Sequence, residues 1–248
     1  MKKLMLNKEE IKKQIYKLSA TTDRGQRLNS LISATYKEKL IEIKKLISEL
    51  ELHSESISEQ SLSGSWELIF SNVELFRSSP FFLAIENALD NKLKSDLFFK
   101  LHQLQVCSFG ISTIGKISQN IDFEKKELIS SFDTIIFGLT TIPIFGWFKL
   151  LPTFGGSVVT LANKISLKNK ILHMALQKTK VIEVDGLNRI PIFSNILMDK
   201  WYKVSDIWQK LPWNNENPSC TLEIIYIDKE MRIVKDIYGS FFIYIREN

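Results

Sequence analysis

The hydrophobic pattern of the chain changes once, near residue 61. Before that point, apolar residues recur at the spacing of amphipathic helices over residues 8–21 and 30–50. After it, they alternate or form short runs rich in β-branched and aromatic residues, as strands do. The pattern therefore predicts an N-terminal helical segment over residues 1–60, packed on a β-barrel domain over residues 61–248.

Eight strand-like runs follow the change in pattern, mostly as consecutive hairpins with short polar turns. A helix is predicted over residues 81–94, and residues 97–109 are ambiguous between strand and helix. Eight antiparallel strands in hairpin order predict an up-and-down barrel, because closure removes the exposed sheet edges. Such a barrel is either filled by its own side chains or holds one small ligand. The predicted strands cover residues 62–70, 111–123, 127–137, 157–167, 171–184, 221–228, 231–235 and 240–245.

Gly64 and Trp66 lie at the start of the first predicted strand. At this position a closed barrel needs a sharp backbone turn into the strand and a large side chain that fills its end. Glycine lets the incoming backbone turn sharply. The indole supplies a large plate and one N–H donor. We expect Trp66 to be structural and to close one end of the barrel.

Three motifs bracket almost the whole chain. They are Thr22-Asp23-Arg24-Gly25 after the first helix, Leu62-x-Gly64-x-Trp66-x-Leu68-x-Phe70, and an acidic hairpin at Tyr226–Ile233 followed by Gly239–Ile243. In this order and spacing they resemble the plastid lipid-associated protein (PAP)/fibrillin family of plastoglobule and thylakoid proteins.

The resemblance implies a lipocalin-like barrel that binds a hydrophobic small molecule or lipid: a quinone, carotenoid, tocopherol or acyl lipid. It implies a structural or carrier role at the periphery of a thylakoid or plastoglobule-type membrane. The compartment would be the cytoplasmic side of the thylakoid in a cyanobacterium-like cell, or the plastid stroma or plastoglobule if a targeting segment has been removed. In barrels of this kind the tryptophan packs on an arginine of a late strand. Gly64, Trp66 and either Arg232 or Arg246 are therefore expected to close the barrel.

The stretch Phe137–Gly156 is almost wholly apolar and is punctuated by Gly and Pro. We predict that it connects two strands. Connectors are normally polar, so an apolar one covers a barrel mouth, contacts a partner or enters a bilayer interface. Trp147 beside Lys149 has the pattern of an interfacial anchor. The membrane-contact candidates are Phe145, Trp147, Phe148 and Lys149, and the ligand-binding candidates are Arg24, Phe70, Phe132, Phe145, Trp147 and Phe154.

The sequence gives little support for nucleic-acid binding, for a metal or cofactor site, or for a membrane-spanning helix. The net charge of +5 is spread without a dense Lys/Arg patch, and we expect no nucleic-acid partner. Cys107 and Cys220 are far apart in the sequence, which favours a reducing compartment. Three scattered histidines lack metal-ligand spacing, so no metal site is expected, nor any cofactor beyond a bound lipid or isoprenoid. The longest charge-free apolar run, Thr134–Phe148, is too short for a bilayer-spanning helix.

Two alternatives to non-enzymatic binding stay open. An enzyme acting on a lipid inside the barrel would need two ionisable groups close together, and Asp122 and Asp133 are the candidate pair. A barrel filled by its own side chains would instead be an interaction module, using residues 137–156 for a protein partner.

Overall fold

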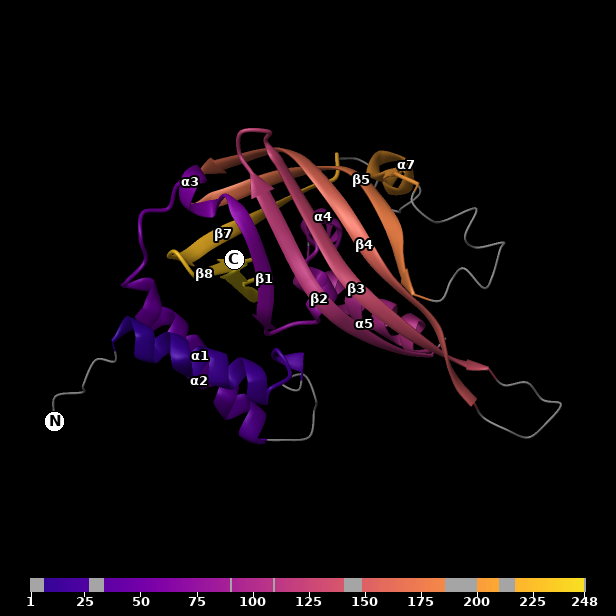
Figure 1. Cartoon of the computed structure of the whole chain (residues 1–248), viewed down its shortest axis with the longest axis horizontal. Coiled ribbons are helices and arrows are strands. Elements are labelled where there is room, and N and C mark those ends of the chain that lie inside the picture. Colours follow the sequence, from indigo (N-terminus) through magenta and orange to yellow (C-terminus); the bar gives the residue numbers. More distant parts are fainter. Residues whose placement is uncertain are drawn as a thin grey trace.

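The computed structural model describes residues 7–26, 34–89, 91–108, 110–140, 149–185, 200–209 and 217–247, and it shows a β-barrel with helices outside it and across one end (Figure 1). The strands are β1 Gly64–Ser71, β2 Gly110–Asp122, β3 Glu127–Thr140, β4 Lys149–Lys168, β5 Ile171–Asp185, β6 Tyr202–Lys203, β7 Ser219–Ile227, β8 Met231–Lys235 and β9 Phe241–Arg246. The helices are α1 Lys8–Thr21, α2 Ala34–Glu51, α3 Glu59–Leu62, the 3-10 helix η2 Leu75–Ser78, α4 Pro80–Ala88, α5 Lys92–Ser108 and α7 Val204–Trp208.

Eight of these strands close into one antiparallel barrel. Neighbours in sequence pair from β1 to β5 and from β7 to β9, β9 returns to pair with β1, and β5 pairs with β7. The predicted up-and-down barrel is therefore confirmed. The β5–β7 pairing covers only Ile171–Ala175, and beyond it β5 pairs with the short β6. Val204 and Trp208 of α7 belong to the barrel core, so this helix packs at the seam.

The strands differ greatly in length, which makes the two ends of the barrel unlike. Strand β4 has 20 residues, whereas β8 has 5 and β9 has 6. Gly64 and Trp66 of β1 lie at the narrow end. At the wide end β2–β5 extend beyond the other strands, and the β3–β4 hairpin projects from the body (Figure 1).

The first two helices pack on the outside of the barrel. Apolar residues of α1 and α2 form one cluster with the outward-facing residues of β7, β8 and β9. Alternation along β8 separates the two faces: Met231 and Ile233 point to the helices, and Val234 points to the interior. The remaining members on the helix side include Ile11, Ile15, Leu18, Ile43, Ile47 and Leu50.

A buried charge cluster attaches α1 to the β7–β8 turn. Lys12 Nζ lies 2.6 Å from Asp228 Oδ2, and the Tyr226 hydroxyl donates to the same oxygen at 2.5 Å. The other oxygen, Asp228 Oδ1, accepts the backbone N–H groups of Glu230 and Met231. Burial disfavours the carboxylate, but the hydrogen bonds from Lys12 and Tyr226 outweigh it and hold the pKa of Asp228 well below its usual range.

We expect Asp228→Asn to lower the free energy of unfolding at neutral pH by about 2–4 kcal/mol, because Lys12 loses its main partner while buried. A folded-state pKa below the unfolded one stabilises the fold above about pH 4 and loses that effect as the pH falls. Urea unfolding at pH 7 and pH 3 measures both effects. At pH 3 the variant should still be less stable than the unaltered chain, but by a smaller margin than at pH 7, because the folded-state pKa of Asp228 lies well below its usual range. An exposed-turn control, Glu124→Gln, should change little at either pH.

Two local predictions need correction. The helix predicted over residues 81–94 ends at Ala88 as α4, and α5 begins at Lys92. The stretch 97–109, which the pattern left open between strand and helix, belongs to α5 as far as Ser108. The stretch 137–156 is not a long connector, because β3 continues to Thr140 and β4 begins at Lys149, with Leu139 opposite Leu150. Pro152 is tolerated there because the pairing shifts register beside it, between Ile136 and Phe137.

Candidate functional site

The narrow end of the barrel is sealed by Trp66. Its side chain is fully buried, and Nε1 donates to the Leu62 carbonyl at 2.9 Å. The Arg246 guanidinium lies 4.1 Å from the indole centroid and donates to the carbonyls of Ser61 and Ser63. A Cβ on Gly64, whose φ is +117°, would lie 2.6 Å from Arg246 Nη1, so the approach requires glycine.

A second arginine lies deeper inside the barrel. Arg232 is 1% exposed, lies 5.0 Å from the Trp66 centroid and 4.4 Å from that of Tyr244, and donates to Gln119 Oε1 at 2.8 Å. Within the described part of the chain no carboxylate pairs with it. Burial lowers the pKa of Arg232 to about 10 and raises the pKa of Tyr244 to about 12. Both groups therefore keep one protonation state near neutral pH.

The floor around these residues is filled. Trp66, Phe242 and Tyr244 are each 0% exposed, so no space large enough for water touches them. A guest in this conformation has no room at the narrow end. A guest inside the barrel would therefore have to bind toward the wide end.

The wide end carries an apolar, aromatic lining that is only partly buried. Ile114 of β2 and Phe132 of β3 pack against the core from the barrel wall, and Phe81, Phe82 and Phe98 do so from the helices. Ring contacts link the helix residues: the Phe81 and Phe82 centroids lie 5.5 Å apart, and Phe98 lies 5.3 Å from Phe99. In Figure 1, α4 and α5 lie behind β2–β4 as a covering layer.

Buried polar contacts hold this helical cover in place. Arg77 of η2 donates to the Glu86 carboxylate on α4, which also accepts from Ser95 of α5 at 3.4 Å. Burial, followed by repulsion from Asp236, raises the pKa of Glu86 to about 7 despite the nearby Arg77. Tyr238 ties the end of α4 to the β8–β9 turn through a 2.5 Å hydrogen bond to the Leu89 carbonyl.

We expect the unaltered chain to lose up to about 3 kcal/mol of stability through Glu86 as the pH rises from about 4.5 to about 7. Stability falls over this range because the folded state holds the Glu86 proton more tightly than the unfolded state does. Glu86→Gln keeps the shape of the protonated acid and should flatten the pH profile above pH 5, a range in which Asp228 does not titrate. Urea unfolding of both proteins from pH 5 to 8 measures how the free energy of unfolding depends on pH. An unchanged slope in the variant would contradict the assignment.

Two of the predicted ligand residues lie outside the barrel. The β1–β9 register shifts between Leu68 and Phe70, and this bulge turns Phe70 away from the interior to stack on Phe241, with centroids 5.7 Å apart. Arg24 donates at 2.5 Å to the Ile114 and Gly115 carbonyls, so it fastens the Thr22–Gly25 corner to β2. Neither residue is placed to contact a guest.

The other predicted residues divide into three groups. Phe132 faces the interior. Phe145, Trp147 and Phe148 lie outside the described residues. Lys149 and Phe154 are backbone members of β4, but their side chains lie outside the described part of the structure.

The candidate catalytic pair is not assembled. Asp122 accepts the backbone N–H of Lys125 at 2.9 Å in the β2–β3 turn. Asp133 is six residues along β3 from Glu127, the pairing partner of Asp122, which is about 20 Å at the rise of a strand. Across the described ranges, no cluster of three or more His, Cys, Asp or Glu side chains could hold a metal ion, and no described helix is long and apolar enough to cross a membrane.

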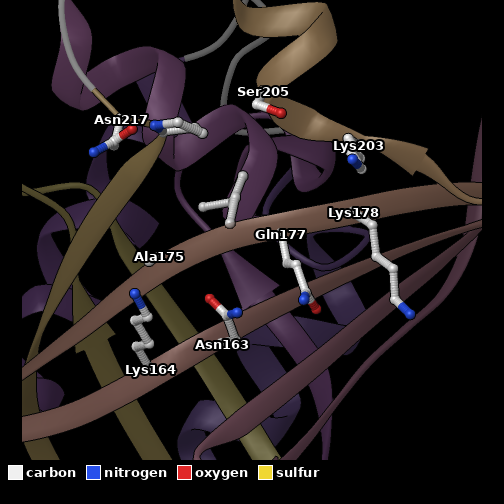
Figure 2. Close-up of a pocket in the computed structure, with 10 residues that line it drawn as sticks. Asn163, Lys164, Ala175, Gln177, Lys178, Lys203, Ser205 and Asn217 are labelled. Atoms are coloured by element: carbon white, nitrogen blue, oxygen red, sulfur yellow. The ribbon is translucent and has the colours of Figure 1, made fainter.

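A separate groove of about 440 Å³ lies outside the barrel, where β4 and β5 meet β6 (Figure 2). Most of its lining residues carry polar side chains, and Figure 2 shows the Lys178 side chain directed away from the Asn163 and Gln177 amides. Lys178 Nζ instead lies 4.5 Å from the Trp201 ring centroid. This open groove gives no apolar enclosure for a lipid. Its lining residues are Asn163, Lys164, Ala175, Leu176, Gln177, Lys178, Lys203, Ser205, Asn217 and Pro218.

Comparison with known proteins gives one informative match. The sequence profile of the PAP_fibrillin family matches residues 9–245. A solved lipocalin-like protein from Bacteroides uniformis ATCC 8492 is 16% identical, with 53% of this chain and 78% of that chain covered, but the TM-score of 0.22 is too low to support an argument. No curated protein matches the sequence.

Proposed function

Because the chain belongs to the PAP_fibrillin family, we propose that it binds a hydrophobic small molecule or lipid and catalyses no reaction on it. The candidate guests are those of the family resemblance: a quinone, carotenoid, tocopherol or acyl lipid. The family is associated with plastid or photosynthetic membranes, and we place this chain at the surface of a thylakoid or plastoglobule.

The observation that carries the proposal is the unlike construction of the two barrel ends. The narrow end is sealed by Trp66 and its arginines, whereas the wide end carries partly buried apolar side chains and is covered by α4 and α5. Small-molecule sites are concave and mostly apolar, with few polar groups. We therefore place the guest between the inner face of β2–β3 and the covering helices, against Ile114 and Phe132.

A non-catalytic role agrees with the chemistry of the interior. Arg232 and Tyr244 titrate far from neutral pH, so they are poor proton donors or acceptors under physiological conditions. Asp122 and Asp133 lie far apart. Binding would be driven by apolar burial, at roughly 25 cal/mol per Å².

The projecting β3–β4 hairpin supports membrane association. Thr140 pairs with Lys149 at its described end, and in the sequence residues 141–148 connect these two positions. Trp147 in that segment and Lys149 at its base are spaced as an interfacial anchor.

Phe132→Asp should weaken binding of α-tocopherol at least about tenfold, because it puts a carboxylate on the apolar inner face. Ile129→Asp is the matched control, since Ile129 lies on the same strand with its side chain 41% exposed. Quenching of intrinsic tryptophan fluorescence measures binding. Equal affinity in both variants contradicts the site, and no binding by the unaltered chain favours the filled-barrel interaction module.

Trp147→Ser should reduce co-flotation with liposomes that contain anionic lipid several-fold, because the proposed anchor loses its interfacial side chain. The control Trp201→Ser removes a tryptophan that is 38% exposed and lies outside the hairpin, and this variant should float like the unaltered chain. Equal flotation of all three proteins would eliminate the anchor.

A further inference from the structure

Helix α5 exposes a stripe of leucines. The side chains of Leu93, Leu97 and Leu101 are 77%, 57% and 56% exposed. Their spacing of four residues places them on one face of the helix. The opposite face carries Ser95 and Phe99, which are 0% and 1% exposed, and packs on the body of the protein. One helix therefore has a buried side and a separate apolar side that faces outward.

The rim of this stripe is positively charged. Lys94 follows Leu93 and Lys100 precedes Leu101, so at 100° per residue the two ammonium groups flank the leucines, and both residues are exposed. Asp96, the acidic residue nearest the stripe on this helix, lies 3.9 Å from Arg77. The surface thus combines apolar side chains with two lysines that form no ion pair within the described part of the chain.

The stripe lies at the same end of the molecule as the projecting hairpin. Helix α5 ends at Ser108, and Gly110 then opens β2 and pairs with Gly138, two residues before the end of β3. In Figure 1, α5 lies beside β2 toward the end from which the β3–β4 hairpin projects.

We propose that the Leu93–Leu97–Leu101 stripe is a docking surface for a bilayer that contains anionic lipid. The leucines enter the acyl boundary, and Lys94 and Lys100 extend to the headgroup phosphates. A second copy of the chain is a poorer occupant, because pairing two stripes would bring their lysine rims together.

This inference rests on the proposed membrane association and adds which surface of the protein contacts the bilayer. Docking through α5 would hold the helical cover of the wide end against the lipid surface. A hydrophobic guest could then pass between bilayer and barrel without crossing water.

The test compares three variants with the unaltered chain by flotation with phosphatidylcholine vesicles, with and without about 30% phosphatidylglycerol. The triple variant Leu93→Ser/Leu97→Ser/Leu101→Ser should lose binding to anionic vesicles at least about tenfold. The variant Lys94→Gln/Lys100→Gln should bind both vesicle types alike. The control Ile41→Ser/Leu52→Ser removes two side chains that are 68% and 72% exposed on and just after α2, and it should float like the unaltered chain.

Because the replaced leucines are exposed, urea midpoints should be unchanged, which separates docking from folding. Undiminished flotation of the triple variant overturns the inference. If that variant floats normally but changes from dimer to monomer in light scattering, a second copy occupies the stripe and the inference is likewise wrong. If Trp147→Ser alone abolishes flotation, the proposed membrane association survives without α5. If the unaltered chain does not float, both fail.

Discussion

The contact of Arg246 with Trp66 closes the barrel, and the placement of everything else depends on that closure. The guanidinium covers the indole at 4.1 Å and donates to the Ser61 and Ser63 carbonyls, while the indole N–H is held by Leu62. A guanidinium–indole contact contributes about 1 kcal/mol, so the stack itself is modest. Its importance lies in joining the last strand to the first strand and to the chain that enters it.

Because its floor is sealed, the barrel has two ends with different roles. With the narrow end filled, only the wide end can admit a guest, and that end is where the helical cover, the projecting hairpin and the leucine stripe are found. Arg232 is a charged group in the interior. It contacts two aromatic faces and donates to Gln119 rather than to a carboxylate, so it contributes to the floor without supplying a group that titrates near neutral pH.

Much of the fold could be read from the sequence because alternation and turn residues are local signals. All eight barrel strands were predictable, and so was the position of Gly64 and Trp66 at the entry to the first. The arginine contact needed the family resemblance, since nothing local links residue 246 to residue 66.

The candidate site was less predictable because its features are tertiary. Phe70 continues the alternation of Trp66 and Leu68 in sequence, yet a bulge reverses its face. Arg24 was predicted to anchor a ligand, but its guanidinium donates to two backbone carbonyls of β2. Leucines spaced as in α5 normally indicate a buried helix face, and only the packing of Phe99 shows that they lie on the other side.

The direct test of a sealed floor and a guest site at the wide end is methyl NMR of the protein during titration with α-tocopherol. The account predicts shifts at Ile114 and Ile85, near the covering helices, and none at Leu68 and Val234 beside the floor. Shifts centred on the floor residues, or none at either end, would contradict it.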